Sequence, residues 1–173
     1  DQGFYFSTIT SSYQDLGDNK IDLYYEIKLG NKAKISKITF IGDKKFKDNT
    51  LRSIILSEEY KFWKFISGKK YLNENLINYD KRLLYNFYKN KGFYNVVIES
   101  SFASYLGNGE FEILYNISSG KKYYFNEFNL NLPIDYELDN FSELNNIFSD
   151  LKGEKYSLNS IDKILKEIDK IVL

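Results

Sequence analysis

The chain has 173 residues, of which 43% are hydrophobic and 28% are charged, and its formal net charge is +0. This composition is ordinary for a globular protein with a buried core. The sequence contains no His and no Cys, which excludes disulfides, thiolate metal sites and the commonest catalytic bases and nucleophiles. We therefore expect no enzymatic activity, no catalytic residues, no metal site and no cofactor.

The predicted elements begin with a hairpin in residues 1–30, which contain two strand-like stretches. A short strand follows over residues 35–41, where apolar residues precede a turn-forming Gly-Asp pair. Asp48 or Asn49 can cap a first helix, and Asn73 can cap a longer one whose apolar residues recur every three or four positions. We expect both helices to pack against the same sheet.

A second hairpin follows the longer helix. Residues 94–102 are strand-like, Gly107-Asn108-Gly109 predicts a tight turn, and residues 111–117 alternate between apolar and polar side chains. The order of elements is then β-α-α-β-β. This order predicts an α+β fold in which two helices cover one face of a three-stranded mixed sheet.

The sequence repeats itself with a period of about 90 residues. Four blocks recur in the same order, each with matching glycines or apolar spacing. The matched blocks are residues 3–9 and 92–98, 21–30 and 111–120, 35–40 and 125–130, and 68–71 and 153–156. Four matches in one order indicate tandem copies of a single structural unit.

The repeat predicts three parts of the chain. Residues 1–30 are the C-terminal part of one unit, residues 31–120 are a complete unit, and residues 121–173 are the N-terminal part of a third. The joints are only a few residues long, so we expect a rod that bends little. The apolar face of the first hairpin should be poorly covered, since an isolated hairpin has nothing to pack against.

Residues 58–71 (EEYKFWKFISGKKY) are the most specific stretch, and residues 92–94 (GFY) add to it. Together they resemble the POTRA (polypeptide-transport-associated) domains of the BamA family of outer-membrane protein assembly factors. The complete unit is similar to the third of five such domains, and the flanking parts resemble the end of the second and the start of the fourth. The resemblance implies tandem POTRA domains in the periplasm, as the soluble part of an outer-membrane protein.

The resemblance also implies a function. A POTRA scaffold of this family docks accessory lipoproteins, BamB-like at the complete domain, and nascent outer-membrane proteins. Docking occurs by β-augmentation, in which an extended segment joins the edge of a sheet. The alternative is a POTRA array of another family member, such as a two-partner secretion transporter or a translocation-assembly protein.

The second strand of a POTRA domain lies at the sheet edge, which makes it the candidate partner-binding site. An open edge exposes unpaired backbone groups, although twist or a neighbouring domain can also protect it. The candidate residues are Tyr94, Asn95, Val96, Val97, Ile98, Glu99, Ser100, Ser101 and Phe102.

Three aromatic residues, Phe62, Trp63 and Phe65, form a second candidate. They either cover the helix ends as part of the core or form an exposed apolar anchor for a partner. The charges leave further alternatives open. Residues 31–92 contain 15 Lys and Arg against 6 Asp and Glu, which indicates a solvated helical face or a surface for an acidic partner or anionic lipid headgroups. No nucleic-acid-binding motif accompanies these charges, so we expect no nucleic-acid partner.

One carboxylate cluster resembles a catalytic arrangement. Glu58 and Glu59 precede the lysine-rich stretch, and Asp80 lies on the longer helix. Two carboxylates held close together can perform acid–base chemistry. We instead expect these groups to be solvated at the end of the first helix.

Overall fold

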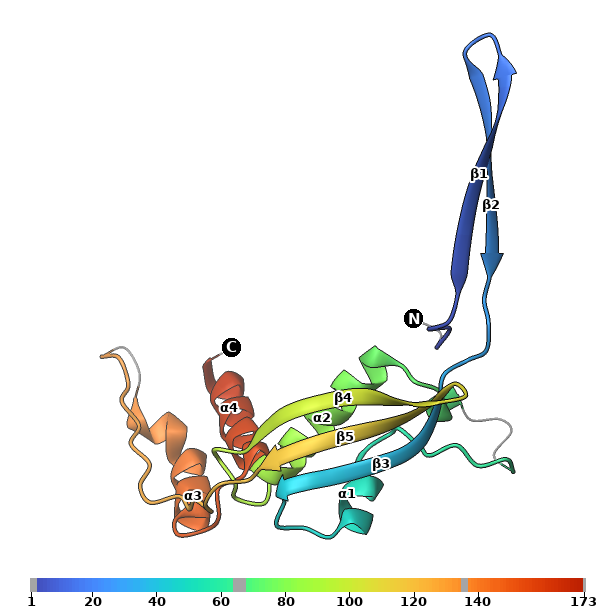
Figure 1. The fold of residues 1–173 in the computed structure, drawn as a ribbon. Coiled ribbons are helices and arrows are strands. Elements are labelled where there is room, and N and C mark those ends of the chain that lie inside the picture. The colour runs from blue at the N-terminus through green and yellow to red at the C-terminus, as the bar shows by residue number, and fades with distance from the viewer. Residues whose placement is uncertain (1–2, 64–67, 135–136, 173) are drawn as a thin grey trace.

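The computed structural model describes residues 3–63, 68–134 and 137–172 (Figure 1). An N-terminal hairpin projects from a central α+β unit, and two further helices lie beyond it. The elements are β1 (Thr8–Gly17), β2 (Lys20–Lys28), β3 (Lys34–Asp43), α1 (Asp48–Ile54), the short 3-10 helix η1 (Gly68–Lys70), α2 (Glu74–Lys89), β4 (Val97–Gly107), β5 (Glu110–Ser118), the 3-10 helix η2 (Leu138–Phe141), α3 (Ser142–Leu151) and α4 (Leu158–Val172).

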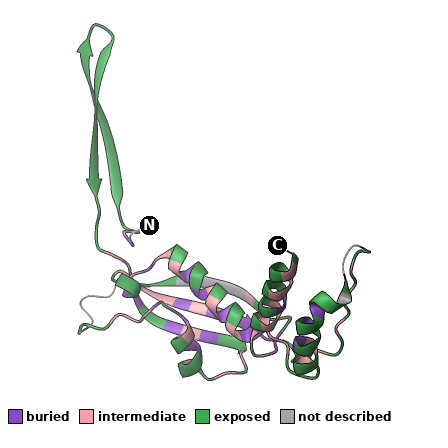
Figure 2. Ribbon diagram, turned by 180° about the vertical axis from the view of Figure 1, so that it is seen from behind, coloured by how far each residue is buried: buried purple, intermediate pink, exposed green. Residues whose placement is uncertain are grey.

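The central unit runs from β3 to β5 and contains a three-stranded sheet of order β3-β5-β4. The middle strand β5 is parallel to β3 and antiparallel to β4. Helices α1 and α2 cover one face of this sheet (Figure 2), and Leu51 of α1 and Ile77 and Leu84 of α2 belong to the buried core. The predicted α+β fold, with its mixed sheet and two helices on one face, is confirmed.

Local signals account for most of these elements. The side chain of Asn73 accepts a hydrogen bond from the Leu76 amide at 3.0 Å, so the predicted cap of α2 is confirmed. The β4–β5 turn places Asn108 at φ 52° between two glycines that also have positive φ, as its sequence predicts. The cap predicted for α1 is wrong. Lys47 occupies the cap position without a side-chain bond, because Asp48 already belongs to the helix and pairs with Lys44.

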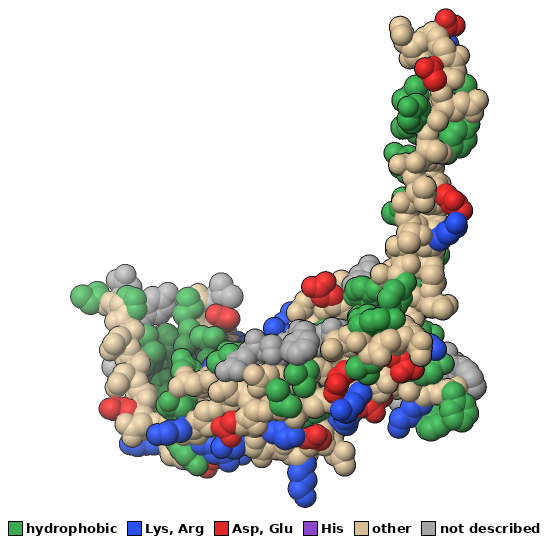
Figure 3. All heavy atoms as spheres, viewed as in Figure 1, with side chains coloured by type: hydrophobic (Ala, Val, Ile, Leu, Met, Phe, Trp, Pro, Cys, Tyr) green, Lys and Arg blue, Asp and Glu red, His purple; other side chains and the backbone are tan. Residues whose placement is uncertain are grey.

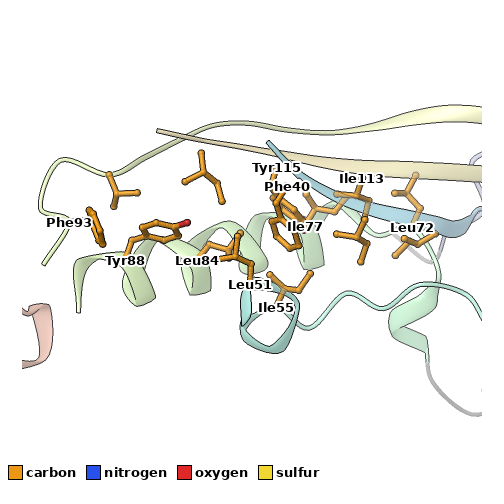
Figure 4. Packing of buried hydrophobic residues seen from close by; sticks show 14 of the residues in the cluster. Phe40, Leu51, Ile55, Leu72, Ile77, Leu84, Tyr88, Phe93, Ile113 and Tyr115 are labelled. Carbon is orange, nitrogen blue, oxygen red and sulfur yellow. The ribbon is translucent and has the colours of Figure 1, made fainter. Parts of the chain in front are cut away.

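The core lies between the sheet and the two helices (Figure 4). On β5, every second residue from Ile113 to Ile117 is buried, as expected for a strand with one covered face. The fully or almost fully buried side chains of the core are Ala33, Ile35, Ile38, Phe40, Leu51, Ile55, Leu72, Ile77, Leu84, Tyr88, Phe93, Val96, Ile113, Tyr115 and Ile117. The aromatic rings interlock, with Phe40 stacked on Tyr115 at 5.5 Å between ring centroids.

Asp80 on α2 is a buried carboxylate within this core, with no solvent exposure. One of its oxygens accepts the Leu56 amide at 2.6 Å, and the other accepts the Ser57 amide at 3.1 Å and the Tyr115 hydroxyl at 3.0 Å. Burial raises the pKa of the Tyr115 phenol and the adjacent carboxylate raises it further, so the hydroxyl stays protonated and donates. The expectation that Asp80 is solvated is therefore wrong.

The β1–β2 hairpin is exposed along both strands, and its apolar side chains reach solvent on the surface (Figure 3). Large side chains such as Ile9, Tyr13 and Leu23 are all exposed. The predicted poor covering of its apolar face is confirmed.

The C-terminal part forms its own small core between η2, α3 and α4, centred on Phe141, Leu144, Ile147 and Ile164. Phe128, Leu130 and Leu132 pack against this core. Their spacing matches β3, but the structure assigns no strand over residues 125–132. Among the described residues no strand lies beside this segment, and an extended segment becomes a strand only when it pairs.

The two joints share one backbone arrangement. At each joint, the residue that follows a hairpin makes two backbone hydrogen bonds. Its amide donates to a glycine carbonyl before the hairpin, and its carbonyl accepts from the segment before the next long helix. The bonds are Ala33 N–H to Gly3 C=O (2.8 Å) and Leu72 N–H to Ala33 C=O (2.9 Å) at the first joint, and Tyr123 N–H to Gly92 C=O (2.8 Å) and Tyr156 N–H to Tyr123 C=O (2.9 Å) at the second. The repeated sequence blocks therefore correspond to repeated contacts.

Replacing Asp80 tests the importance of the buried carboxylate. We expect Asp80→Asn to lower the free energy of unfolding by about 2 kcal/mol, because an amide nitrogen cannot accept a hydrogen bond and at least one of the three buried donors loses its acceptor. Urea denaturation followed by circular dichroism measures this change. Glu110→Gln, the same change at an exposed position, should have little effect. Equal stability of the two variants would contradict the role assigned to Asp80.

Candidate partner-binding edge

Strand β4 lies at one edge of the sheet, with only β5 beside it (Figure 1). Within the described part of the chain, no segment pairs with its outer side. A strand in this position carries backbone N–H and C=O groups that can bind an added strand. The structure therefore places six of the nine candidate residues, from Val97 to Phe102, on an edge strand.

Tyr94, Asn95 and Val96 do not belong to this strand, and their assignment to it is wrong. They form a turn in which the Val96 amide donates to the Phe93 carbonyl at 3.2 Å. Phe93 and Val96 are both buried in the core, which requires the chain to curve before β4 begins. The apolar pattern here reflects core packing and not strand alternation.

Two irregularities divide β4. The register with β5 shifts between Ile98 and Ser100, and again between Tyr105 and Gly107. A bulge of this kind bends a strand and interrupts the alternation of its backbone groups. Residues 100–105 form the regular stretch between the two bulges. Only within this stretch do successive backbone N–H groups point alternately toward β5 and away from it.

The opposite edge of the sheet, β3, is largely sealed. The Tyr60 amide donates to the Ile35 carbonyl at 2.6 Å, and the Glu59 carboxylate accepts the Ile38 amide at 3.0 Å. Arg52 donates to the Ile38 carbonyl and also pairs with Glu59. Glu59 therefore binds the outer side of β3 and the Arg52 side chain.

Both ends of the β4 edge are bounded by the joints. At one end the Phe6 ring, at the base of the hairpin, lies 5.4 Å from the Tyr105 ring. At the other end Tyr94 contacts Tyr123 and Tyr156 at 5.8 and 5.0 Å between ring centroids. The open edge is thus a short segment between two aromatic contacts.

The Lys89 ammonium strengthens the second of these contacts. It lies 4.1 Å from the centroid of the Tyr94 ring, 5.1 Å from that of Tyr85 and 5.6 Å from that of Tyr156. Beside it, the Asn90 side chain accepts the Asn159 amide at the start of α4 at 2.8 Å. These contacts attach α2 of the central unit to α4.

A hollow of ≈ 350 Å³ lies between α2 and the start of β4. It combines two cationic side chains with apolar surface. The lining residues are Lys81, Arg82, Tyr85, Val96, Val97 and Ile98. Sequence analysis did not identify Lys81 or Arg82, because their position beside β4 depends on how α2 crosses the sheet.

Phe62 and Trp63 lie in the loop that leads to η1, and their side chains are 72% and 59% exposed. Their rings pack edge to face at 4.7 Å, with Lys61 5.8 Å from the Trp63 ring. Of the two alternatives for Phe62 and Trp63, the core position is wrong and the exposed one is observed, because the core contains Leu72 and Ile77 without them. Phe65 lies outside the described residues.

Two other kinds of site are absent from the described residues. Over residues 3–63, 68–134 and 137–172, no group of three or more Asp, Glu, His or Cys side chains could hold a metal ion. In the same ranges, no helix has the length and apolar character to cross a membrane.

Residues 33–120 match a protein-family model, POTRA, described as "Surface antigen variable number repeat". The chain belongs to the POTRA family. The matched segment coincides with β3 to β5 and therefore includes the open edge. The family match therefore covers all three strands of the β3-β5-β4 sheet.

Two curated relatives and one solved structure resemble this POTRA chain. It is 24% identical to an outer membrane protein assembly factor BamA from Buchnera aphidicola subsp. Acyrthosiphon pisum over 90% of the chain and 25% of that protein. It is 26% identical to a second BamA, from Neorickettsia risticii, over 49% of the chain and 11% of that protein. The crystal structure of Haemophilus influenzae BamA POTRA3-5 aligns with a TM-score of 0.62 at 11% identity, covering 98% of this chain and 63% of that chain. The structural match shows the same fold.

Hydrogen exchange can test the sealing of β3. We expect Glu59→Ala to accelerate exchange of the Ile38 amide about tenfold, because that amide loses its acceptor and is exposed to water. NMR or mass spectrometry measures the rate, and the Ile113 amide on the central strand serves as an internal control. An unchanged Ile38 rate would show that Glu59 does not protect the edge.

Proposed function

We propose that this chain is a segment of a periplasmic, non-enzymatic scaffold for outer-membrane β-barrel assembly, and that β4 receives partners by β-augmentation. The partners are accessory lipoproteins, BamB-like at the central unit, and nascent outer-membrane proteins. The observation that carries the proposal is the contrast between the two sheet edges. The β3 edge is bonded to Arg52, Glu59 and Tyr60, whereas the outer side of β4 has no pairing segment among the described residues.

The relatives support this proposal. Both curated relatives are named outer membrane protein assembly factors, and the aligned crystal structure contains POTRA domains of such a factor. The chain spans 25% and 11% of the two relatives, so the activity and partners of a whole protein are part of the proposal. We place the chain in an array: the end of one unit in residues 1–30, a whole unit in 31–120 and the start of a third in 121–173.

Backbone pairing suits a scaffold with many partners. An added strand gains affinity chiefly from main-chain hydrogen bonds, which every sequence except proline can supply. Side chains then contribute only where the surface beside the edge is specific. A single edge can therefore hold different extended segments in turn.

The exposed Phe62–Trp63 pair supports a second contact surface for the same scaffold. Exposed aromatic side chains that pack on each other are typical of anchors in protein interfaces. The pair lies in the loop after α1 and not on β4, so a folded lipoprotein could use it in addition to the edge.

Proline substitutions test the use of β4. Ala103 and Ser104 are adjacent in the regular stretch, so their N–H groups point to opposite sides of the strand. We expect one of Ala103→Pro and Ser104→Pro to stay folded but bind partners at least about tenfold more weakly, because its outward N–H is lost. The other should be destabilised by roughly 3 kcal/mol or more, since a bond to β5 is lost.

Circular dichroism and thermal melting separate the two outcomes, and titration calorimetry measures binding of an accessory lipoprotein or an unfolded client. Ala103→Ser and Ser104→Ala keep the backbone N–H and are the matched controls. If a folded proline variant binds as tightly as the unchanged chain, β4 is not the augmentation edge.

The anchor role of Trp63 has its own test. We expect Trp63→Ala to weaken lipoprotein binding about tenfold while the melting temperature stays the same, because the side chain is exposed. Tyr13→Ala, at an exposed aromatic residue on the hairpin, is the control. Unchanged affinity in the Trp63 variant would remove this surface from the proposal.

A further inference from the structure

We propose that the hollow between α2 and β4 is a subsite for a carboxylate, so that β4 prefers extended segments carrying an acidic side chain. The inference rests on the proposed use of β4 as an augmentation edge. It adds the chemistry of the preferred segment and names the residues that select it.

The lining of the hollow is cationic at one side and apolar at the other. Lys81 and Arg82 come from α2, while Val97 and Ile98 come from the first residues of β4. Among the lining side chains that the structure describes, none is a carboxylate. The hollow therefore offers positive charge to whatever enters it.

The two cations are held at the rim in different ways. The Arg82 guanidinium lies 5.0 Å from the centroid of the Tyr79 ring, which does not line the hollow, so this side chain would turn away from Tyr79 to reach a bound carboxylate. Lys81 is half-buried, and its side chain lines the hollow beside the first residues of β4. Lys89, one turn or more further along α2, is instead surrounded by tyrosine rings at the joint.

The geometry of strand addition brings side chains into this hollow. An added strand would lie about 4.8 Å outside β4, and every second side chain would point toward the helix layer. At the level of Val97 and Ile98, that layer presents Lys81, Arg82 and Tyr85. The methylene groups of a Glu side chain would contact the apolar wall, and its carboxylate would pair with Lys81 and with Arg82 once Arg82 turns from Tyr79.

The preferred segment can be described by its pattern. It is extended, with apolar or small residues on the side facing α2 and one acidic residue on that side near the start of β4. Its length is limited, because the contact between Phe6 and Tyr105 closes the other end of the edge. The preferred partner is therefore a short extended segment that is apolar on one side and carries one acidic residue.

Three peptides test the proposal. They are nine-residue peptides of alternating Val and Thr, capped at both ends, that differ only in carrying Glu, Gln or Lys at one central position. Fluorescence anisotropy with the 173-residue chain measures their dissociation constants at low and high salt. We expect the Glu peptide to bind about fivefold to tenfold more tightly than the Gln peptide, with the Lys peptide weakest and the differences reduced at high salt.

Charge reversal in the protein completes the test. In a Lys81→Glu, Arg82→Glu variant the order of the peptides should reverse, whereas Lys166→Glu on exposed α4 should leave it unchanged. If the reversed variant loses its circular dichroism signal, Lys81→Gln with Arg82→Gln replaces it and should abolish the preference. Equal binding of the Glu and Gln peptides, with both lost in the outward β4 proline variant, would overturn the carboxylate subsite and leave augmentation intact. Binding that does not depend on β4, or no binding of any peptide, would contradict both.

Discussion

The carboxylate of Asp80 connects three parts of the central unit that are distant in the sequence. Asp80 belongs to α2. Its carboxylate accepts hydrogen bonds from the backbone just after α1 and from Tyr115 on the middle strand. By fixing Leu56 and Ser57, it also sets the path of the residues that follow. Those residues are Glu59 and Tyr60, which then lie along β3 and bond to it. The buried carboxylate thus holds the segment whose next residues cover the β3 edge, while the β4 edge stays unpaired among the described residues.

The fold could be predicted from sequence where the controlling interactions are local. The Asn73 cap and the β4–β5 turn are encoded within a few residues, and local apolar spacing predicted the order of the elements. The predicted edge strand began too early because Tyr94 and Val96 have the residue types and alternation of a strand, whereas Val96 is buried together with Phe93. These two buried residues are apolar for another reason, since the chain curves around them in the core.

The residues that complete the site could not be predicted in this way. Arg52 and Glu59 reach Ile38, and Lys81 lies beside Ile98, only after the helices pack on the sheet. No local pattern distinguishes these side chains from other charged residues in a lysine-rich stretch. The same limit applies to Phe62 and Trp63. Their apolar character suggested the core, but only the closure of the core over Leu72 shows that the loop is left outside.

The bulge in β4 between Ile98 and Ser100 has a consequence for self-association. An edge that accepts extended segments can also pair with the same edge of a second copy, which leads to aggregation. Two folded copies would each bring a bent, rigid β4, and the bulges would prevent their backbones from pairing over more than the short regular stretch between them. An unfolded segment has no such constraint, because it can follow the bend. For the proposed function, this irregular edge would favour flexible segments over folded strands, so that copies of the chain would not compete with its proposed partners.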